Sequence, residues 1–157
     1  MTTTTFADYA AAAEARKDIA AKVLAHSLEL CEALRQNYIN YAIRMSKVSM
    51  SRDGDSKEYY EDRIAKLEKG ICDVDFTLDT GRKYHKIWHL DSGGSRSCHA
   101  FIDKKTGEVY KPASYKAPAK GVRYNLLIIK EREWVLNPAN CDWAGGYLYR
   151  NSSYFCS

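Results

Sequence analysis

Residues 71–90 read ICDVDFTLDTGRKYHKIWHL, and within them the chain changes from a helical to a strand-like hydrophobic pattern. Across residues 72–78 apolar side chains alternate with Asp or Thr, which is the period of a half-buried strand. Residues 79–81 (Asp-Thr-Gly) have turn chemistry, and a second alternating run follows at residues 82–90. The sequence therefore predicts a β-hairpin here.

Downstream of the hairpin the same alternation continues between Gly-containing turns. Three further strands are expected, at residues 96–103, 108–111 and 122–130. Residues 112–121 form an irregular basic loop with two prolines, which a central strand would not tolerate. Residues 131–136 could continue the last strand or form a helical turn. Residues 143–155 are typical of a short final strand or of an aromatic segment packed back on the sheet.

The N-terminal part predicts a long helix at about residues 6–47, because Thr5 is a good N-cap and no Pro or Gly interrupts the run. At 1.5 Å per residue this helix would be roughly 60 Å long, more than a domain of this size normally buries. Its apolar or small residues with helical spacing are Leu24, Leu28, Cys31, Tyr38, Ala42 and Met45. We expect this stripe to pack on the protein's own sheet, as is common. The alternative is a coiled-coil seam, with partner contacts at Leu24, Leu28, Cys31 and Tyr38.

A polar connection at residues 49–55 leads into a second helix at residues 56–69, with Asp55 as its N-cap. Together these elements predict an α+β fold, in which a long and a shorter helix pack on an antiparallel meander sheet of about five strands. Residues 1–70 would form the helical part and residues 71–157 the sheet part of one compact domain.

Positive charge is concentrated in the middle of the chain. The 157-residue protein has a net charge of +4, yet residues 82–130 contain 11 Lys or Arg and three Asp or Glu. Six of these cations lie in or near turns and the basic loop: Lys104, Lys105, Lys111, Lys116, Lys120 and Arg123. Interleaved with them are Tyr110, Tyr115 and Tyr124. Cations suit a phosphate backbone and exposed rings suit stacked bases, although sheet tyrosines are often core and turn lysines often serve solubility.

Length and composition exclude several classes of protein. A chain of 17.9 kDa is too short for a repeat array or a multidomain machine. Its five cysteines are odd in number and lack a Cys-x-x-Cys pair, which predicts free thiols rather than a disulfide framework or a zinc knuckle. It lacks an apolar run of 18 residues and a signal-peptide pattern, so we expect a soluble, non-secreted protein without a membrane partner.

Residues 96–126 read RSCHAFIDKKTGEVYKPASYKAPAKGVRYNL. They contain a Ser-x-His-x-Phe run, an Asp-x-x-Thr-Gly hairpin, a Tyr-Lys pair and Ser-Tyr-Lys-Ala-Pro-Ala-Lys, and Gly-Arg-Lys-Tyr at residues 81–84 lies upstream. This core resembles a widespread family of small uncharacterised proteins of tailed bacteriophages, in which Trp usually stands at the position of Tyr115. The resemblance implies a phage origin and action in the host cytoplasm, and it implies no catalytic residue.

The histidines and cysteines do not form a convincing catalytic or metal site. His85 and His89 would share a strand face but lie about 13 Å apart, too far to hold one ion. His89 could meet Cys98 or His99 across the hairpin, which supplies only two ligands. Cys98 and His99 are consecutive, so on a regular strand they point to opposite faces and cannot act as nucleophile and base. We expect no metal, no cofactor and no enzymatic activity.

The leading functional prediction is a small phage accessory protein that binds nucleic acid with little sequence preference. The expected contacts are Lys104, Lys105, Lys111, Lys116, Lys120, Arg123 and a stacking Tyr115. One alternative is a protein-interaction module that binds a host or phage protein, or a second copy, through the N-terminal helix. Another is a protein that sequesters a nucleotide-like anion in the loop at residues 116–123.

Overall fold

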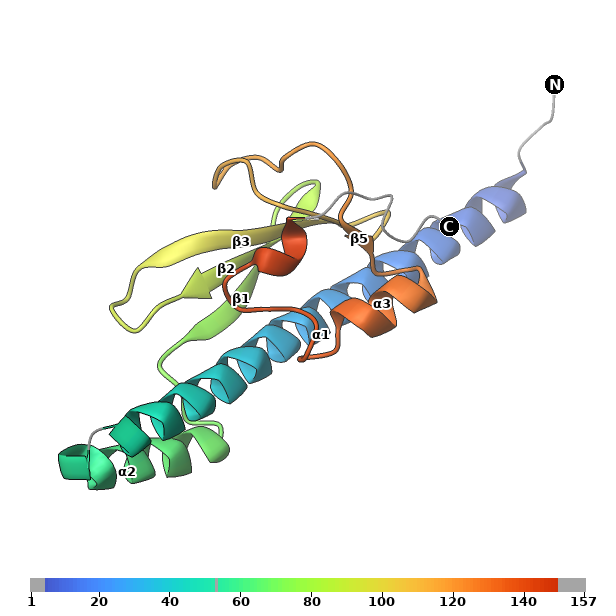
Figure 1. Ribbon diagram of the computed structural model, residues 1–157. Helices are drawn as coiled ribbons and strands as arrows, with labels where there is room; N and C mark the ends of the chain where they lie inside the picture. Colours follow the sequence, from blue (N-terminus) through green and yellow to red (C-terminus); the bar gives the residue numbers. More distant parts are fainter. Residues whose placement is uncertain (1–4, 53, 150–157) are drawn as a thin grey trace.

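The computed structural model describes residues 5–52 and 54–149, in which helix α1 lies along one face of a five-stranded sheet (Figure 1). α1 spans Phe6–Arg52, 47 residues, or about 70 Å at the α-helical rise. A capping box begins the helix: the Asp8 N–H donates to Thr5 Oγ1 at 3.1 Å, and the Asp8 carboxylate accepts from the Thr5 N–H at 3.5 Å. The predicted long helix and the α+β class are confirmed.

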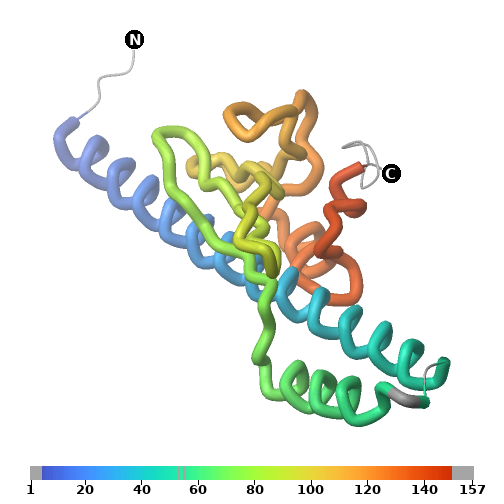
Figure 2. Tube along the Cα trace, turned by 90° about the vertical axis from the view of Figure 1, so that its left-hand side faces the viewer, coloured from blue at the N-terminus to red at the C-terminus, as the bar shows by residue number. Residues whose placement is uncertain are grey.

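From Val23 onward α1 packs against the rest of the protein. Its buried residues are Val23, Ser27, Leu30, Cys31, Ala33, Leu34, Ile39, Ala42 and Ser46. At its N-terminal end this stripe is rotated by one residue from the predicted one, because Leu24 and Leu28 are 39% and 49% exposed. The predicted stripe is therefore corrected there, and also at Met45, which is 43% exposed while Ser46 beside it is buried. The N-terminal end of α1 projects past the sheet (Figures 1 and 2).

Helix α2 spans Lys57–Glu68 and follows a short 3₁₀ helix, η1, at Gly54–Ser56. The prediction of a polar connection at residues 49–55 was wrong for most of its length, because α1 continues to Arg52. The N-cap of α2 is Ser56 rather than Asp55, and its side chain makes no capping hydrogen bond. Helix continuation is favoured here since no Pro or Gly stands before Gly54.

α2 returns beside the C-terminal half of α1, where Leu67 is buried with Ile39 and Ala42 (Figure 2). It ends at Gly70, whose φ of +82° lies in the left-handed region. The Ile71 N–H donates to the Lys66 carbonyl at 3.0 Å, as in a Schellman motif.

The sheet is an antiparallel meander with strand order β1-β2-β3-β4-β5. The strands are β1 (Asp75–Thr80), β2 (Tyr84–Leu90), β3 (Arg96–Asp103), β4 (Glu108–Tyr110) and β5 (Tyr124–Asn125). The inner face buries Phe76, Ile87 and Ile102 in one core with Leu30 and Leu34 of α1. The predicted meander is confirmed.

A β-bulge interrupts the pairing of β2 with β3. Ile87 pairs with Ala100 and Trp88 pairs with Cys98, so His99 is the extra residue. His99 is buried, although its neighbour Cys98 is only half-buried. The regular alternation assumed for this strand therefore ends at His99.

The prediction of a fifth strand at residues 122–130 was wrong for all but Tyr124 and Asn125. The Asn125 side chain accepts a hydrogen bond from the Leu127 N–H at 2.8 Å, and the Glu131 carboxylate accepts from the Asn125 N–H at 3.1 Å. These bonds turn the chain, and helix α3 begins immediately afterwards at Ile129–Val135. Of the predicted 131–136 segment, residues 131–135 are thus helical, and Leu136 is the C-cap.

The segment after α3 packs back on the core through Trp143, Tyr147 and Leu148, the last two in a short 3₁₀ helix, η2, at Gly146–Leu148. The aromatic-segment alternative is therefore confirmed as far as residue 149, and the rest of the predicted 143–155 segment lies outside the described residues. Asn37 of α1 holds this segment: its Nδ2 donates to the Pro138 carbonyl at 2.8 Å, and its Oδ1 accepts from the Trp143 N–H at 2.9 Å.

Candidate nucleic-acid interface

Two basic turns lie at the same end of the sheet. In a meander the first and third turns lie at the same end of the sheet. Arg82 and Lys83 therefore lie beside Lys104 and Lys105. Lys104 joins the turns, because its N–H donates to the Lys83 carbonyl at 3.1 Å and its Nζ donates to the Gly81 carbonyl at 2.9 Å. Four cations, in two pairs of neighbouring residues, therefore lie at one end of the sheet.

A hollow of about 400 Å³ opens from these turns onto the outer face of the sheet. Its cations are Arg82, Lys83, Lys86 and Lys116, and its floor includes Tyr84 and Phe101. The Lys86 ammonium donates to the Tyr115 carbonyl and lies 5.0 Å from the ring centroid of Trp88. This bond ties the loop after β4 to the sheet, where Lys116 lines the hollow.

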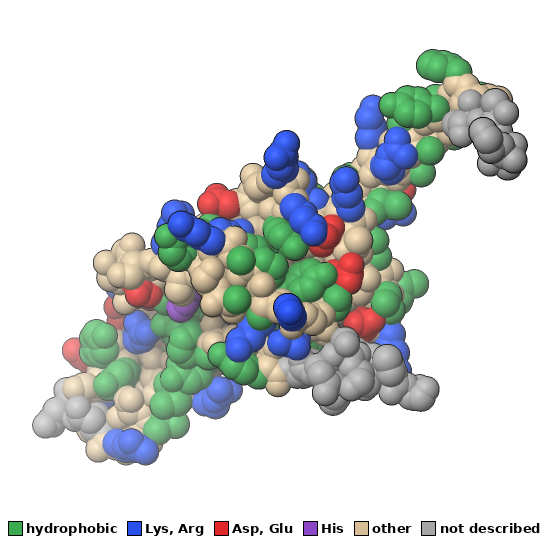
Figure 3. Space-filling view, turned by 90° about the horizontal axis from the view of Figure 1, so that it is seen from above, with side chains coloured by type: hydrophobic (Ala, Val, Ile, Leu, Met, Phe, Trp, Pro, Cys, Tyr) green, Lys and Arg blue, Asp and Glu red, His purple; other side chains and the backbone are tan. Residues whose placement is uncertain are grey.

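A groove of about 760 Å³ lies on the other side of the turns, between them and α1. Its floor contains Ala13, Ile19 and Ala20, and its cations are Arg16, Lys17, Arg82, Lys83, Lys104 and Lys105. The groove and the outer hollow share Arg82 and Lys83, so they lie next to each other at the first turn. Figure 3 shows Lys and Arg side chains gathered where the projecting helix leaves the body of the protein.

We call Arg82, Lys83, Lys86, Lys104, Lys105 and Lys116 the turn surface. No carboxylate of residues 5–52 or 54–149 pairs with any of the six. The nearby carboxylates are used internally: Asp79 accepts from Trp88 Nε1 at 2.9 Å, and Asp103 accepts from the Lys105 N–H at 2.8 Å. Asp79 lines the outer hollow and Asp103 lines the groove, so the turn surface carries an excess of positive charge rather than cations alone.

One of the three tyrosines predicted to lie among the cations is available for stacking. Tyr115 is 61% exposed, and the Lys116 ammonium lies 5.5 Å from its ring centroid. Tyr124 is fully buried, and its hydroxyl donates to the Tyr147 carbonyl at 2.7 Å. Tyr110 is half-buried and packs edge-on against Tyr84.

The other predicted cations do not join the turn surface. Lys111 lines a separate hollow beside His89 and Trp143, and its ammonium lies 3.9 Å from the ring centroid of Tyr149. Arg123 is half-buried with no hydrogen-bond partner for Nε, and Lys120 lines neither the groove nor the outer hollow. Arg82, Lys83 and Lys86 take their place. Sequence reasoning missed these three as site residues, although the charge density of residues 82–130 included them.

The predicted partner-binding residues of α1 separate into two groups. Cys31 is buried in the protein's own core, where burial raises its thiol pKa to about 12. Tyr38 packs on the same core, with its ring centroid 5.4 Å from that of Trp143. Cys31 and Tyr38 therefore pack inside the protein instead of facing a partner. Leu24 and Leu28 lie at the surface.

The histidines of the sheet pack within the fold, and His85 and His99 are also hydrogen-bonded, whereas the buried Nε2 of His89 has no hydrogen-bond partner. His85 Nδ1 lies 2.9 Å from Thr80 Oγ1, and His99 Nε2 lies 2.8 Å from the Tyr147 hydroxyl. The His89 ring stacks on Phe76. Burial lowers the pKa of all three. Within the part of the chain that the structure describes, no three His, Cys, Asp or Glu side chains are grouped to hold a metal ion.

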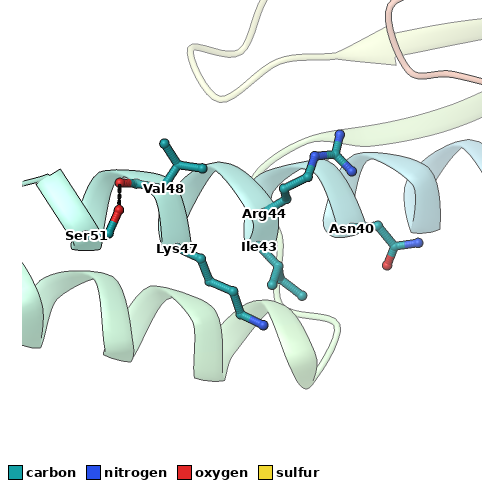
Figure 4. Close-up of a pocket in the computed structure, with 6 residues that line it drawn as sticks. All are labelled: Asn40, Ile43, Arg44, Lys47, Val48 and Ser51. Atoms are coloured by element: carbon teal, nitrogen blue, oxygen red, sulfur yellow. Dashed lines mark hydrogen bonds between the residues drawn. The ribbon is translucent and has the colours of Figure 1, made fainter.

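A further hollow, drawn in Figure 4, is formed by side chains of α1 alone. Arg44 and Lys47 point away from each other, and the hydrogen bond drawn is the local one from Ser51 Oγ to the Val48 carbonyl, 2.8 Å. Because its polar groups do not converge, we do not treat this hollow as a binding site.

The fold and this surface define an α+β protein with a basic, solvent-facing sheet edge next to an exposed ring. The chain belongs to a family of unknown function, DUF7717, whose model matches residues 6–150. The match includes the long helix, which the motif resemblance at residues 96–126 does not reach. No curated protein and no solved structure matches the chain. None of the described helices is long and apolar enough to cross a membrane.

Proposed function

We propose that this protein binds nucleic acid, without strong sequence preference, across the turn surface and Tyr115. The observation that carries the proposal is that six cations converge at one end of the sheet. None of them forms an ion pair with a carboxylate of the described residues. Surfaces that bind a phosphate backbone need such cations, because the binding free energy comes largely from released counterions.

The arrangement also suits a single strand. Tyr115 offers an exposed ring beside Lys116, and Lys86 holds the backbone of Tyr115 in place. Stacking on such a ring stabilises any base, since every base has a π-face. A phosphate track with one fixed ring favours affinity over sequence discrimination. On the motif resemblance, we further propose that the protein is a phage accessory protein that acts in the host cytoplasm.

The test is a fluorescence-anisotropy titration of labelled single-stranded and duplex oligonucleotides over a series of salt concentrations. The logarithm of the association constant should fall linearly with the logarithm of salt, by roughly 0.7 per single-strand phosphate contact, so six contacts give a slope of about −4. An excess of mononucleotide should not compete, which separates polymer binding from sequestration of a small anion.

The decisive variant combines Arg82→Glu, Lys105→Glu and Lys116→Glu, which reverses charge at exposed positions of the turn surface. Its matched control combines Lys47→Glu, Arg52→Glu and Lys69→Glu, which makes the same charge change at exposed positions of α1 and α2. The first variant should lose binding and flatten the salt slope, whereas the control should keep most of both. Equal losses in the two variants, or no binding at low salt, would refute the proposal.

A further inference from the structure

The N-terminal segment of α1, residues 6–22, is a helix without a packing partner on most of its surface. Phe6 and Tyr9 are 85% and 61% exposed, and every residue from 14 to 22 is exposed. An isolated helix of this length is marginally stable in water, because most helical stability in proteins comes from packing an apolar face. The start of this segment projects beyond the body of the protein, whereas residues 13–20 run beside the turns of the sheet (Figures 1 and 2).

The rings of this segment continue the buried face of α1. Counting back from Val23 in steps of three and four gives Ala20, Arg16, Ala13, Tyr9 and Phe6, which lie on one side of a helix. Ala13 and Ala20 are the floor of the groove beside the turn surface. One helix face therefore carries two large rings at its start and a floor of small side chains further along.

The two ends of the segment also differ in charge. Residues 6–15 contain Asp8 and Glu14 and no Lys or Arg. The groove over Ala13 and Ala20 has cationic walls, which include Lys83, Lys104 and Lys105. The rings at one end of the segment thus fit the floor of small side chains at the other end. The carboxylates at the first end are complementary in charge to the cations beside that floor.

We propose that two copies of this chain form a two-fold symmetric dimer through antiparallel pairing of these helical segments. With Ala13 near the two-fold axis, Phe6 of each copy lies over Ala20 of the other, because both positions are seven residues, or about 10 Å, from Ala13. Glu14 of each copy then lies close to the wall of the other's groove. Every contact occurs twice, as in any isologous interface.

The exposed rings supply about half of the area that a standard interface buries. Four rings that bury roughly 150–250 Å² each contribute about 600–1,000 Å² before the groove walls are counted, and standard interfaces bury about 1,200–2,000 Å² in total. Nucleic acid in the groove would use the cations but would leave Phe6 and Tyr9 uncovered. A second copy covers the rings, the alanine floor and the charges together. Arg82, Lys86 and Lys116 line the outer hollow and stay open to nucleic acid, as does the exposed Tyr115. In the dimer about three of the six phosphate contacts remain, which gives a salt slope of about −2.

The test is the molecular mass of the full chain, treated with nuclease, measured by light scattering and sedimentation over a range of protein concentration. The expected mass is twice 17.9 kDa at high concentration. Phe6→Glu with Tyr9→Glu should weaken dimerisation by at least about 100-fold, because two interface anchors are lost. These exposed positions in the first turn tolerate acidic residues, and circular dichroism checks that the helix persists. The matched control, Tyr59→Glu, replaces a ring that is 63% exposed on α2 and should leave the mass unchanged.

A charge swap tests the pairing itself. Lys105→Glu and Glu14→Lys should each weaken the dimer, and the two together in one chain should restore part of the affinity. A monomer at every concentration would overturn the proposal, and so would a dimer that survives Phe6→Glu with Tyr9→Glu. A doubled mass that disappears on nuclease treatment would assign the groove to nucleic acid instead. Loss of oligonucleotide binding with an intact dimer would refute the proposed function alone.

Discussion

The ring of His99 and the hydroxyl of Tyr147, 48 residues apart in the chain, share a buried hydrogen bond of 2.8 Å from Nε2 to Oη. The His99 ring also stacks on that of Tyr147 and packs edge-on against Phe76. This pair joins the bulge of β3 to the segment after α3, so the C-terminal part of the described chain is attached to the sheet through a polar group inside the core. A buried imidazole of this kind stays neutral.

We expect the protein to lose stability as the pH falls from about 6.5 to about 4. Burial, with a smaller effect of His89, lowers the pKa of His99 from 6.5 to about 4, against an opposing effect of Asp142. The unfolded chain then binds more protons than the folded one between these two pH values. The free energy of unfolding therefore decreases by about 3 kcal/mol as the pH is lowered across this range. His85 and His89 act in the same direction, since burial lowers their pKa as well. Urea unfolding across this range measures the slope, and His99→Leu with Tyr147→Phe should flatten it. An unchanged slope in that variant would contradict the assignment.

Asn37→Ala should destabilise the protein by about 1–3 kcal/mol, because it leaves the Trp143 N–H and the Pro138 carbonyl without their partner. Asn40→Ala is the matched control: it makes the same change one turn along α1, where the side chain only accepts an exposed hydrogen bond from Gln36. Its effect should stay within about 0.5 kcal/mol. Chemical unfolding of both variants measures the difference, and equal effects would show that Asn37 does not hold this segment.

The thiols of Cys31, Cys98 and Cys141 should resist iodoacetamide in the folded protein at neutral pH. Burial raises their pKa to about 12, about 11 and about 12, so almost no thiolate is present to react. Peptide mass mapping before and after unfolding in urea gives the comparison, with full alkylation expected only after unfolding. Rapid native alkylation of Cys98 would show that its side of the sheet opens in solution.

Much of the fold follows from local pattern, and the errors occur where side chains override it. Strands β1 and β2 were predictable because apolar and polar residues alternate at residues 72–90, and the glycine-containing turns on either side mark β3, where the alternation ends at His99. The strand at residues 122–130 failed because side-chain bonds of Asn125 and Glu131 redirect an apolar run into α3. Such bonds depend on which groups meet in space, and hydrophobic period alone does not report them.

The candidate site was predictable in part for a topological reason. The count of charges along the chain located Lys104, Lys105 and Lys116. The strand order of a meander implies in addition that the first turn, with Arg82 and Lys83, lies at the same end of the sheet as the third turn. Arg16 and Lys17 were not predictable, because they reach the groove only through the course of a helix across the sheet. The stripe on α1 was shifted because Ser27 is buried, with its hydroxyl donating to the Val23 carbonyl at 2.7 Å.

Tyr115→Ala should weaken single-strand binding by roughly 5- to 100-fold, the usual range for one base stacked on one ring. Duplex affinity should change little, because paired bases already stack on their neighbours. The salt slope should also stay constant, since the substitution removes no charge. Tyr115→Trp should keep or raise the affinity, and Tyr59→Ala, which removes a similarly exposed ring from α2, should have no effect. Anisotropy titrations with both polymers measure all four outcomes. If Tyr115→Ala weakens duplex and single strand equally, the ring holds the loop and its lysine in place rather than stacking on a base.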